Sequence, residues 1–194
     1  MKPMPSPEEV RALLRGRRAI FPPLYTDEPI SREIIEDLLE NANWAPTHKK
    51  TEPWRFKVIR GAARQRLADF LQATYQAVTP VAAFSEKKFE KLGQNPLKSD
   101  TVIAICMQRD PAASLPEWEE LAAVAMAVQN LWLTAAAYNL GGYWSSPNLM
   151  DHAQELLDLR EGERCFGLFY LGHHQAPDLP GERGPVADKV VWME

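Results

Sequence analysis

The 194-residue sequence predicts one α+β domain, residues 1–194, with three layers: a central mixed sheet covered by helices on both faces. Two continuous apolar runs, 101–107 and 165–172, are typical of strands that are buried on both sides. A third observation is the segment 117–139, which is apolar almost all round in its helical pattern after Leu121. A helix with so little polar surface must be buried, against the sheet, a partner subunit, or both.

Capping signals predict where the outer helices begin. Ser6 and Pro7 supply a hydroxyl cap and a proline at the first helical position, and this helix is expected to end near Gly16. Ser31 caps a second helix that leads into a loop beginning at Asn43. Periodicity and turn signals predict the remaining elements: a strand at 56–59, a helix at 62–78 and a short helix at 151–159. The glycines at 141 and 142 are expected to end the long helix at 117–139.

Two segments allow more than one interpretation. Residues 83–99 are polar and basic with helically spaced apolar positions, which fits either a mobile lid or an ordinary surface helix. Residues 173–194 form a polar, proline-rich arm that ends in an apolar extended piece at 190–193. That piece needs a sheet edge, which its own subunit or a partner subunit can provide.

Composition narrows the class of protein. A formal net charge of −4 argues against nucleic acid as the main partner. We find no run of about 18 apolar residues and no leader-like apolar start, so we expect a cytoplasmic protein without a membrane partner. Cys106 and Cys165 lie inside apolar runs and are expected to be buried thiols, and no metal-ligand spacing is found.

The most unusual stretch is the loop at 43–56. Two prolines, Pro46 and Pro53, stiffen it, and it also carries two Trp, a His and two Lys. Stiffness, cations and flat rings suit a planar, anionic ligand. The alternative is a proline-rich turn whose two Trp fill the core.

Four segments of the chain, taken together, resemble the FMN-dependent nitroreductase family. The loop reads Trp44-Ala45-Pro46-Thr47-His48, then Glu52-Pro53-Trp54-Arg55-Phe56, similar to the family's Ala-Pro-Ser/Thr and Gln-Pro-Trp-x-Phe signature. The other three segments follow in the family's order: Arg17-Arg18-Ala19, Gly141 to Ser146, and Arg183-Gly184-Pro185 with Val191-Trp192. The resemblance spans nearly the whole chain.

The resemblance implies an FMN site and names its residues. Arg17, Arg18 and Ala19 occupy the phosphate and ribityl positions, and Arg183 matches a tail cation that contacts the phosphate. The full set of implied cofactor-binding residues is Arg17, Arg18, Ala19, Trp44, His48, Lys50, Trp144, Ser145, Ser146 and Arg183.

Two positions depart from the family pattern. Ala19 lacks the hydroxyl that relatives usually carry, which leaves only its backbone N–H as a donor. Phe21 stands where many members have a Lys near the flavin N1 edge, so Arg18, Lys50 or His48 would have to supply positive charge there.

The resemblance further implies an intertwined homodimer in which the C-terminal strand is exchanged. It implies hydride transfer from NAD(P)H through flavin N5 to an electron-poor acceptor such as a nitroaromatic, quinone or enone. Alternatives are a narrow-substrate flavoenzyme of the same fold, for reductive dehalogenation or flavin breakdown, and a non-catalytic module that binds a phosphorylated metabolite. No catalytic side chain is assigned; His48 is a ring-edge contact or a proton source.

Overall fold

The computed structural model describes residues 4–177 and 181–194, and it confirms the α+β fold. Four strands form one sheet in the order β1-β2-β4-β3. Their bounds are β1 (Trp54–Arg60), β2 (Thr101–Gln108), β3 (Gly141–Ser145) and β4 (Glu163–Gly172). Every pairing is antiparallel, so the prediction of a mixed sheet is wrong for the strands described here. The two continuous apolar runs are the central strands β2 and β4, covered on both faces.

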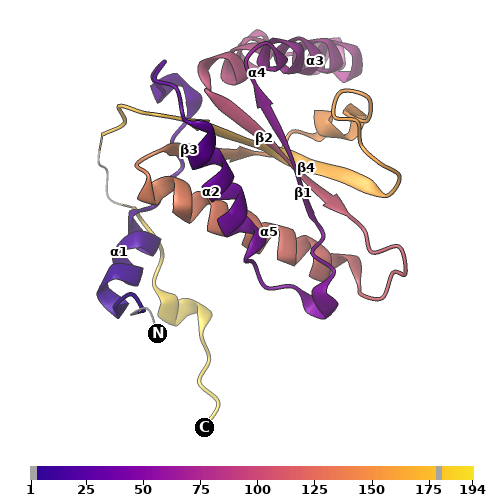
Figure 1. Cartoon of the computed structure of the whole chain (residues 1–194). Helices are drawn as coiled ribbons and strands as arrows, with labels where there is room; N and C mark the ends of the chain where they lie inside the picture. The colour runs from indigo at the N-terminus through magenta and orange to yellow at the C-terminus, as the bar shows by residue number, and fades with distance from the viewer. Residues whose placement is uncertain (1–3, 178–180) are drawn as a thin grey trace.

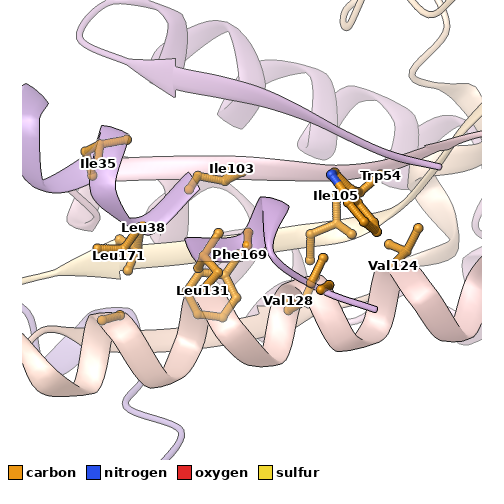
Figure 2. Packing of buried hydrophobic residues seen from close by; sticks show 14 of the residues in the cluster. Ile35, Leu38, Trp54, Ile103, Ile105, Val124, Val128, Leu131, Phe169 and Leu171 are labelled. Carbon is orange, nitrogen blue, oxygen red and sulfur yellow. The ribbon is translucent and has the colours of Figure 1, made fainter. Parts of the chain in front are cut away.

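Helices cover both faces of this sheet (Figure 1). On one face lie α2 (Arg32–Asn43) and α5 (Glu117–Ala137), and on the other lie α3 (Ala63–Val78) and α4 (Glu86–Lys98). Figure 2 shows Val124, Val128 and Leu131 of α5 facing Ile105 and Phe169 of the sheet. Length and composition alone would let α5 cross a membrane, which corrects the expectation that no segment reaches that limit. Its apolar character instead serves this core.

The capping predictions for the first two helices are confirmed. Ser6 accepts a hydrogen bond from the Glu9 amide, and Glu9 accepts one from the Ser6 amide, at the start of α1 (Pro7–Gly16). The Ser31 hydroxyl caps α2 by accepting a hydrogen bond from the Ile34 amide. However, α1 buries none of its residues, and it lies outside the three layers (Figure 1).

The glycines at 141 and 142 do not end α5, contrary to prediction. The helix stops at Ala137, and Asn139 takes the left-handed conformation with φ of 55°. Both glycines belong to β3, where they make room for neighbouring side chains. A Cβ on Gly141 would lie 2.5 Å from the Tyr25 ring, and one on Gly142 would lie 2.9 Å from Trp132 Nε1.

The predicted helix at 151–159 is also wrong. The structure has a 3-10 helix at Asn148–His152 followed by turns, with Asp158 at a positive φ of 47°. A helix this short gains too few hydrogen bonds to offset its nucleation, so burial of Leu149, Met150 and Leu157 decides the backbone path.

The segment 83–99 contains α4, which packs beside α3 and buries Gly93, Asn95 and Pro96. The remaining short 3-10 helices are at Pro22–Leu24, His48–Lys50, Val81–Ala83 and Val186–Lys189.

The described part of the arm, up to 177 and from 181 on, makes no strand of its own sheet. Residues 173–175 pair with residues 24–26, whereas residues 181–194 run past α1 and away from the three layers (Figure 1). The arm's apolar residues Val191, Trp192 and Met193 are 84–95% exposed. Strand exchange with a partner stays a prediction.

Candidate functional site

Three guanidinium groups gather where α1 ends and the C-terminal arm crosses it. We call Arg17, Arg18 and Arg183 the arginine cluster. Burial, followed by the charges of Arg183 and Arg18, lowers the pKa of Arg17. The crossing is close, because a Cβ on Gly181 would lie 2.5 Å from Cζ of Arg18. Residues far apart in sequence therefore form one concentrated positive charge.

The described residues give Arg17 and Arg183 no carboxylate partner. Arg183 donates to its neighbouring Glu182 carbonyl at 2.6 Å, and Arg18 donates to the Arg17 carbonyl at 2.8 Å. Arg17 instead lies over an aromatic ring, with Cζ 4.3 Å from the Trp132 ring centroid. Like charges held together raise each other's energy, and a bound anion would relieve that cost. The arrangement suits a phosphate, which guanidinium groups bind through paired N–H donors.

The start of β3 lies beside this cluster. The Ile20 amide donates to the Gly142 carbonyl at 3.0 Å, which ties the segment containing Ala19 to the strand. Ala19 itself is exposed, as its predicted backbone role requires. The structure therefore brings Arg17, Arg18, Ala19 and Arg183 together near the strand that carries Trp144 and Ser145.

Two buried indole N–H groups on the α5 face of the sheet have no hydrogen-bond partner in the described chain. They belong to Trp132 and Trp144. Trp144 lies against the irregular part of β4, where a Cβ on Gly167 would come within 2.7 Å of its Nε1. Ser145 is half-buried and Ser146 is exposed where β3 ends. An unpaired buried donor is costly, so each of these groups would gain from a hydrogen-bond acceptor.

The loop at residues 47–52 lies at the other end of α5, and we call it the His48 loop. His48 Nδ1 is 2.7 Å from Glu119 Oε2, and Lys49 Nζ donates to the Ser114 carbonyl at 3.0 Å. Within the loop, the Glu52 amide donates to the Thr47 hydroxyl at 3.3 Å. These contacts hold a backbone that includes positive φ angles at Lys49, Lys50 and Glu52, which L-residues rarely adopt.

The two Trp residues flanking the loop differ. Trp54 is buried and donates to Asn43 Oδ1 at 3.0 Å, so it does fill the core. Trp44 is 77% exposed and donates to Glu40 at 3.0 Å. Trp44 instead borders an open groove of about 560 Å³ between α1, α2 and α5. Its lining also includes Leu13, Asp37, Asn41, Asn130, Leu133, Thr134, Ala137 and Tyr138.

One chain does not bring the His48 loop to the arginine cluster. The loop is tied to Glu119 and the cluster rests on Trp132, and both residues belong to α5. At 1.5 Å of rise per residue, these anchor points are about 20 Å apart along the helix. The predicted site therefore exists in each chain as two separate halves.

Phe21 turns away from the arginine cluster. Its ring lies 4.6 Å from that of Tyr143, which points to the opposite face of β3 from Trp144. Position 21 thus supplies neither a cation nor a ring on the Trp132 side.

Two residues at the candidate site have no site role in the prediction from sequence: Glu119, which contacts His48, and Trp132, which lies under Arg17. Both are on α5, where helical periodicity accounts for them as ordinary surface and core positions.

Comparisons with known proteins agree with this architecture. The model of the nitroreductase family matches residues 14–173. YdjA of Escherichia coli K12, named as a candidate NAD(P)H nitroreductase, is 28% identical over 145 residues, covering 74% of this chain and 77% of YdjA.

Two solved structures cover almost the entire chain. A nitroreductase-like family protein from Bacillus cereus has a TM-score of 0.79 and 26% identity, covering 100% of this chain and 99% of its own. A candidate nitroreductase from Desulfovibrio desulfuricans, solved in complex with FMN, has a TM-score of 0.73 and 27% identity, with coverage of 98% and 99%.

Proposed function

Because the chain belongs to the nitroreductase family, we propose that it is an FMN-dependent oxidoreductase. In this proposal NAD(P)H is the reductant, and the acceptor is an electron-poor small molecule such as a nitroaromatic, quinone or enone. The NAD(P)H part is supported by the similarity to YdjA, and the FMN part by the similarity to the FMN complex from Desulfovibrio desulfuricans. The proposal includes a cytoplasmic location, where NAD(P)H is available.

The observation that carries the proposal is the arginine cluster. Arg17 and Arg183 have no carboxylate partner among the described residues. Burial and the neighbouring charges also lower the pKa of Arg17, so its positive charge is not compensated within the chain. A phosphate monoester would neutralise this charge. The unpaired indole N–H group of Trp144 lies on the same side of the sheet as the arginine cluster and suits the polar edge of a flat ring. The donor set therefore fits a ring system that ends in a phosphate, as FMN does.

Bound FMN would supply the redox chemistry, by accepting hydride at N5 and passing the electrons to the acceptor. The tasks of the chain are binding and orientation. Arg17 and Arg183 hold the phosphate, with Ala19 contributing its backbone N–H, and Arg18 contacts the isoalloxazine. Trp144, Ser145 and Ser146 lie along the ring.

The His48 loop completes the site in our proposal, together with Trp44 and Lys50. Because Glu119 occupies Nδ1 of His48, Nε2 is the nitrogen that faces a ligand. Since Phe21 supplies no cation, positive charge at the N1 edge falls to Arg18, Lys50 or His48.

We propose that the two halves meet in a homodimer, where the His48 loop of one copy faces the arginine cluster of the other. The separation of the halves along α5 supports this arrangement. So do the uncovered apolar residues of α1, Val10, Leu13 and Leu14, which are 38–50% exposed. The exposed arm ending in Trp192 and Met193 would gain a sheet edge from the partner.

The test is to purify the protein, record its absorbance and determine its size in solution. We expect a yellow dimer whose flavin band is bleached by NADPH or NADH and restored by a nitroaromatic or a quinone. Bleaching by dithionite but not by a nicotinamide would favour a narrow-substrate flavoenzyme, which halogenated tyrosine or oxygen would then probe. A colourless, monomeric protein that does not bind added FMN would overturn the proposal.

A further inference from the structure

We infer that Trp132 is a positioning residue: its indole face holds Arg17 in the arginine cluster and thereby sets the affinity for the phosphate of the bound flavin nucleotide. The inference rests on the proposed function. It gives α5, a helix of the core, a role in ligand recognition.

The contact between the two residues is direct. Cζ of Arg17 lies 4.3 Å from the Trp132 ring centroid, well inside the range of a cation–π interaction, for which Trp is the best aromatic partner. Arg17 is also the C-cap residue of α1, a helix that buries none of its residues. The guanidinium therefore depends on the indole for its position more than on the helix that carries it.

The indole is itself held firmly. It packs edge-on against Phe169, with ring centroids 5.2 Å apart and an interplanar angle of 83°. Gly142 provides the space, because a Cβ there would lie 2.9 Å from the Trp132 Nε1 atom. The Gly142 carbonyl also accepts the hydrogen bond from Ile20, three residues after Arg17. One strand position thus fixes both the ring and the segment that it supports.

The charges around Arg17 explain why it needs this support. Burial, followed by the charges of Arg183 and Arg18, lowers the pKa of Arg17, and both of these charges repel its charged form. Without the ring, the Arg17 guanidinium would gain by moving away from them into water. The preformed phosphate site would then lose one of its donors before any ligand arrives.

The predicted consequence is selective. Loss of the ring weakens binding of the phosphate and leaves contacts to the isoalloxazine in place. FMN and riboflavin differ only in that phosphate, so their affinities separate positioning from general packing.

The experiment compares Trp132→Phe and Trp132→Leu with wild type, using the full chain stripped of flavin. Dissociation constants for FMN and riboflavin are measured by quenching of flavin fluorescence, with the melting temperature of each apoprotein recorded. We expect Trp132→Leu to weaken FMN binding about five- to twentyfold while riboflavin changes less than about twofold, and Trp132→Phe to fall between. Trp118→Leu, an exposed Trp on the same helix, is the matched control and should change neither constant.

A double-mutant cycle adds the decisive arm. In an Arg17→Ala background, Trp132→Leu should change FMN affinity less than about twofold, because the residue it positions is gone. Equal losses for FMN and riboflavin, or an undiminished effect in that background, would overturn the inference and leave the proposed function intact. Wild-type protein without affinity for FMN would overturn both.

Discussion

At one end of α5, Arg17 and Arg183 lie together with no carboxylate partner among the described residues, whereas at the other end His48 and Lys49 are both paired. His48 contacts Glu119 at 2.7 Å, and Lys49 donates to the Ser114 carbonyl at 3.0 Å. The two halves therefore differ in their partners within the chain: His48 and Lys49 of the loop have polar partners, whereas the charges of Arg17 and Arg183 are not neutralised.

This difference indicates how each half prepares for a ligand. Contacts within the chain hold the His48 loop in an unusual backbone shape, so it is organised in advance. The arginine cluster is organised by Trp132 and opposed by its own charges, so binding of an anion stabilises it. Flavin binding should therefore stabilise the α1 end of the protein more than the loop end.

The largest expected effect comes from breaking the support of the His48 loop. The side chain of Glu120 is fully buried, pairs with Arg109 and accepts from the Asp110 amide at 2.9 Å. Those contacts fix the segment that carries Ser114, the partner of Lys49. Glu120→Ala should lower the free energy of unfolding by about 3–5 kcal/mol, because it leaves a partly buried Arg109 unpaired. Urea denaturation measures this.

The exposed pair of Glu117 with Arg164 provides the control for that change. Glu117→Ala should cost less than about 1 kcal/mol, as solvent screens a surface pair. A comparably small loss for Glu120→Ala would mean that the loop end of α5 does not depend on its buried charge.

The second largest effect concerns the arginine cluster. Arg17→Ala should weaken FMN binding by about 1.5–3 kcal/mol through loss of a charge-assisted phosphate contact. The apoprotein should not lose comparable stability, because the substitution also removes repulsion from Arg183 and Arg18. Fluorescence titration with FMN measures the first quantity and thermal unfolding the second, with Arg17→Lys as the charge-retaining control. Unchanged FMN affinity would remove Arg17 from the phosphate site.

Local signals made much of this fold predictable. The caps at Ser6 and Ser31 and the two buried strands depend on residues within a few positions of each other, and all were confirmed. The glycines at 141 and 142 misled because glycine often ends a helix, whereas here Asn139 takes that conformation and the glycines make room for Tyr25 and Trp132. Only the packing of distant segments could reveal that role.

In the candidate site, too, some residues were predictable from the sequence and others depend on contacts between distant segments. Resemblance identified Arg17 and His48, but neither periodicity nor motif assigned their supports, Trp132 and Glu119, a site role. Those contacts join residues 71 positions apart in the case of His48 and Glu119, and no local pattern encodes such a pairing. The arrangement of the two halves in an assembly remains a prediction, because it depends on a second copy.

A smaller effect probes the pairing of His48 directly. Glu119→Gln removes the charge and keeps a hydrogen-bonding group, and His48 is largely exposed. We expect the free energy of unfolding to fall by no more than about 1 kcal/mol. Faster proteolysis within the loop is the more sensitive measurement. A loss of unfolding free energy above about 2 kcal/mol would show that the His48 loop depends mainly on this contact, and that its other hydrogen bonds do not hold it.

The smallest effect concerns the base of the arm that carries Arg183. His174 accepts a hydrogen bond from the Ala176 amide at 3.1 Å, and burial, together with the charge of His173, lowers its pKa below the usual 6.5. Folding therefore favours the neutral ring. The contribution is fully present above pH 6.5 and is lost as the pH falls below that value, where the unfolded chain takes up the proton first.

His174→Gln should remove this part of the pH dependence. The difference in unfolding free energy between wild type and the variant, measured by urea denaturation at pH 7.5 and pH 5.5, should shift against the wild type at the lower pH. His152→Gln, at an exposed histidine outside the arm, serves as the control. If the wild type and His174→Gln respond identically to acid, the neutral ring does not hold the base of the arm, and Arg183 reaches the cluster by other contacts.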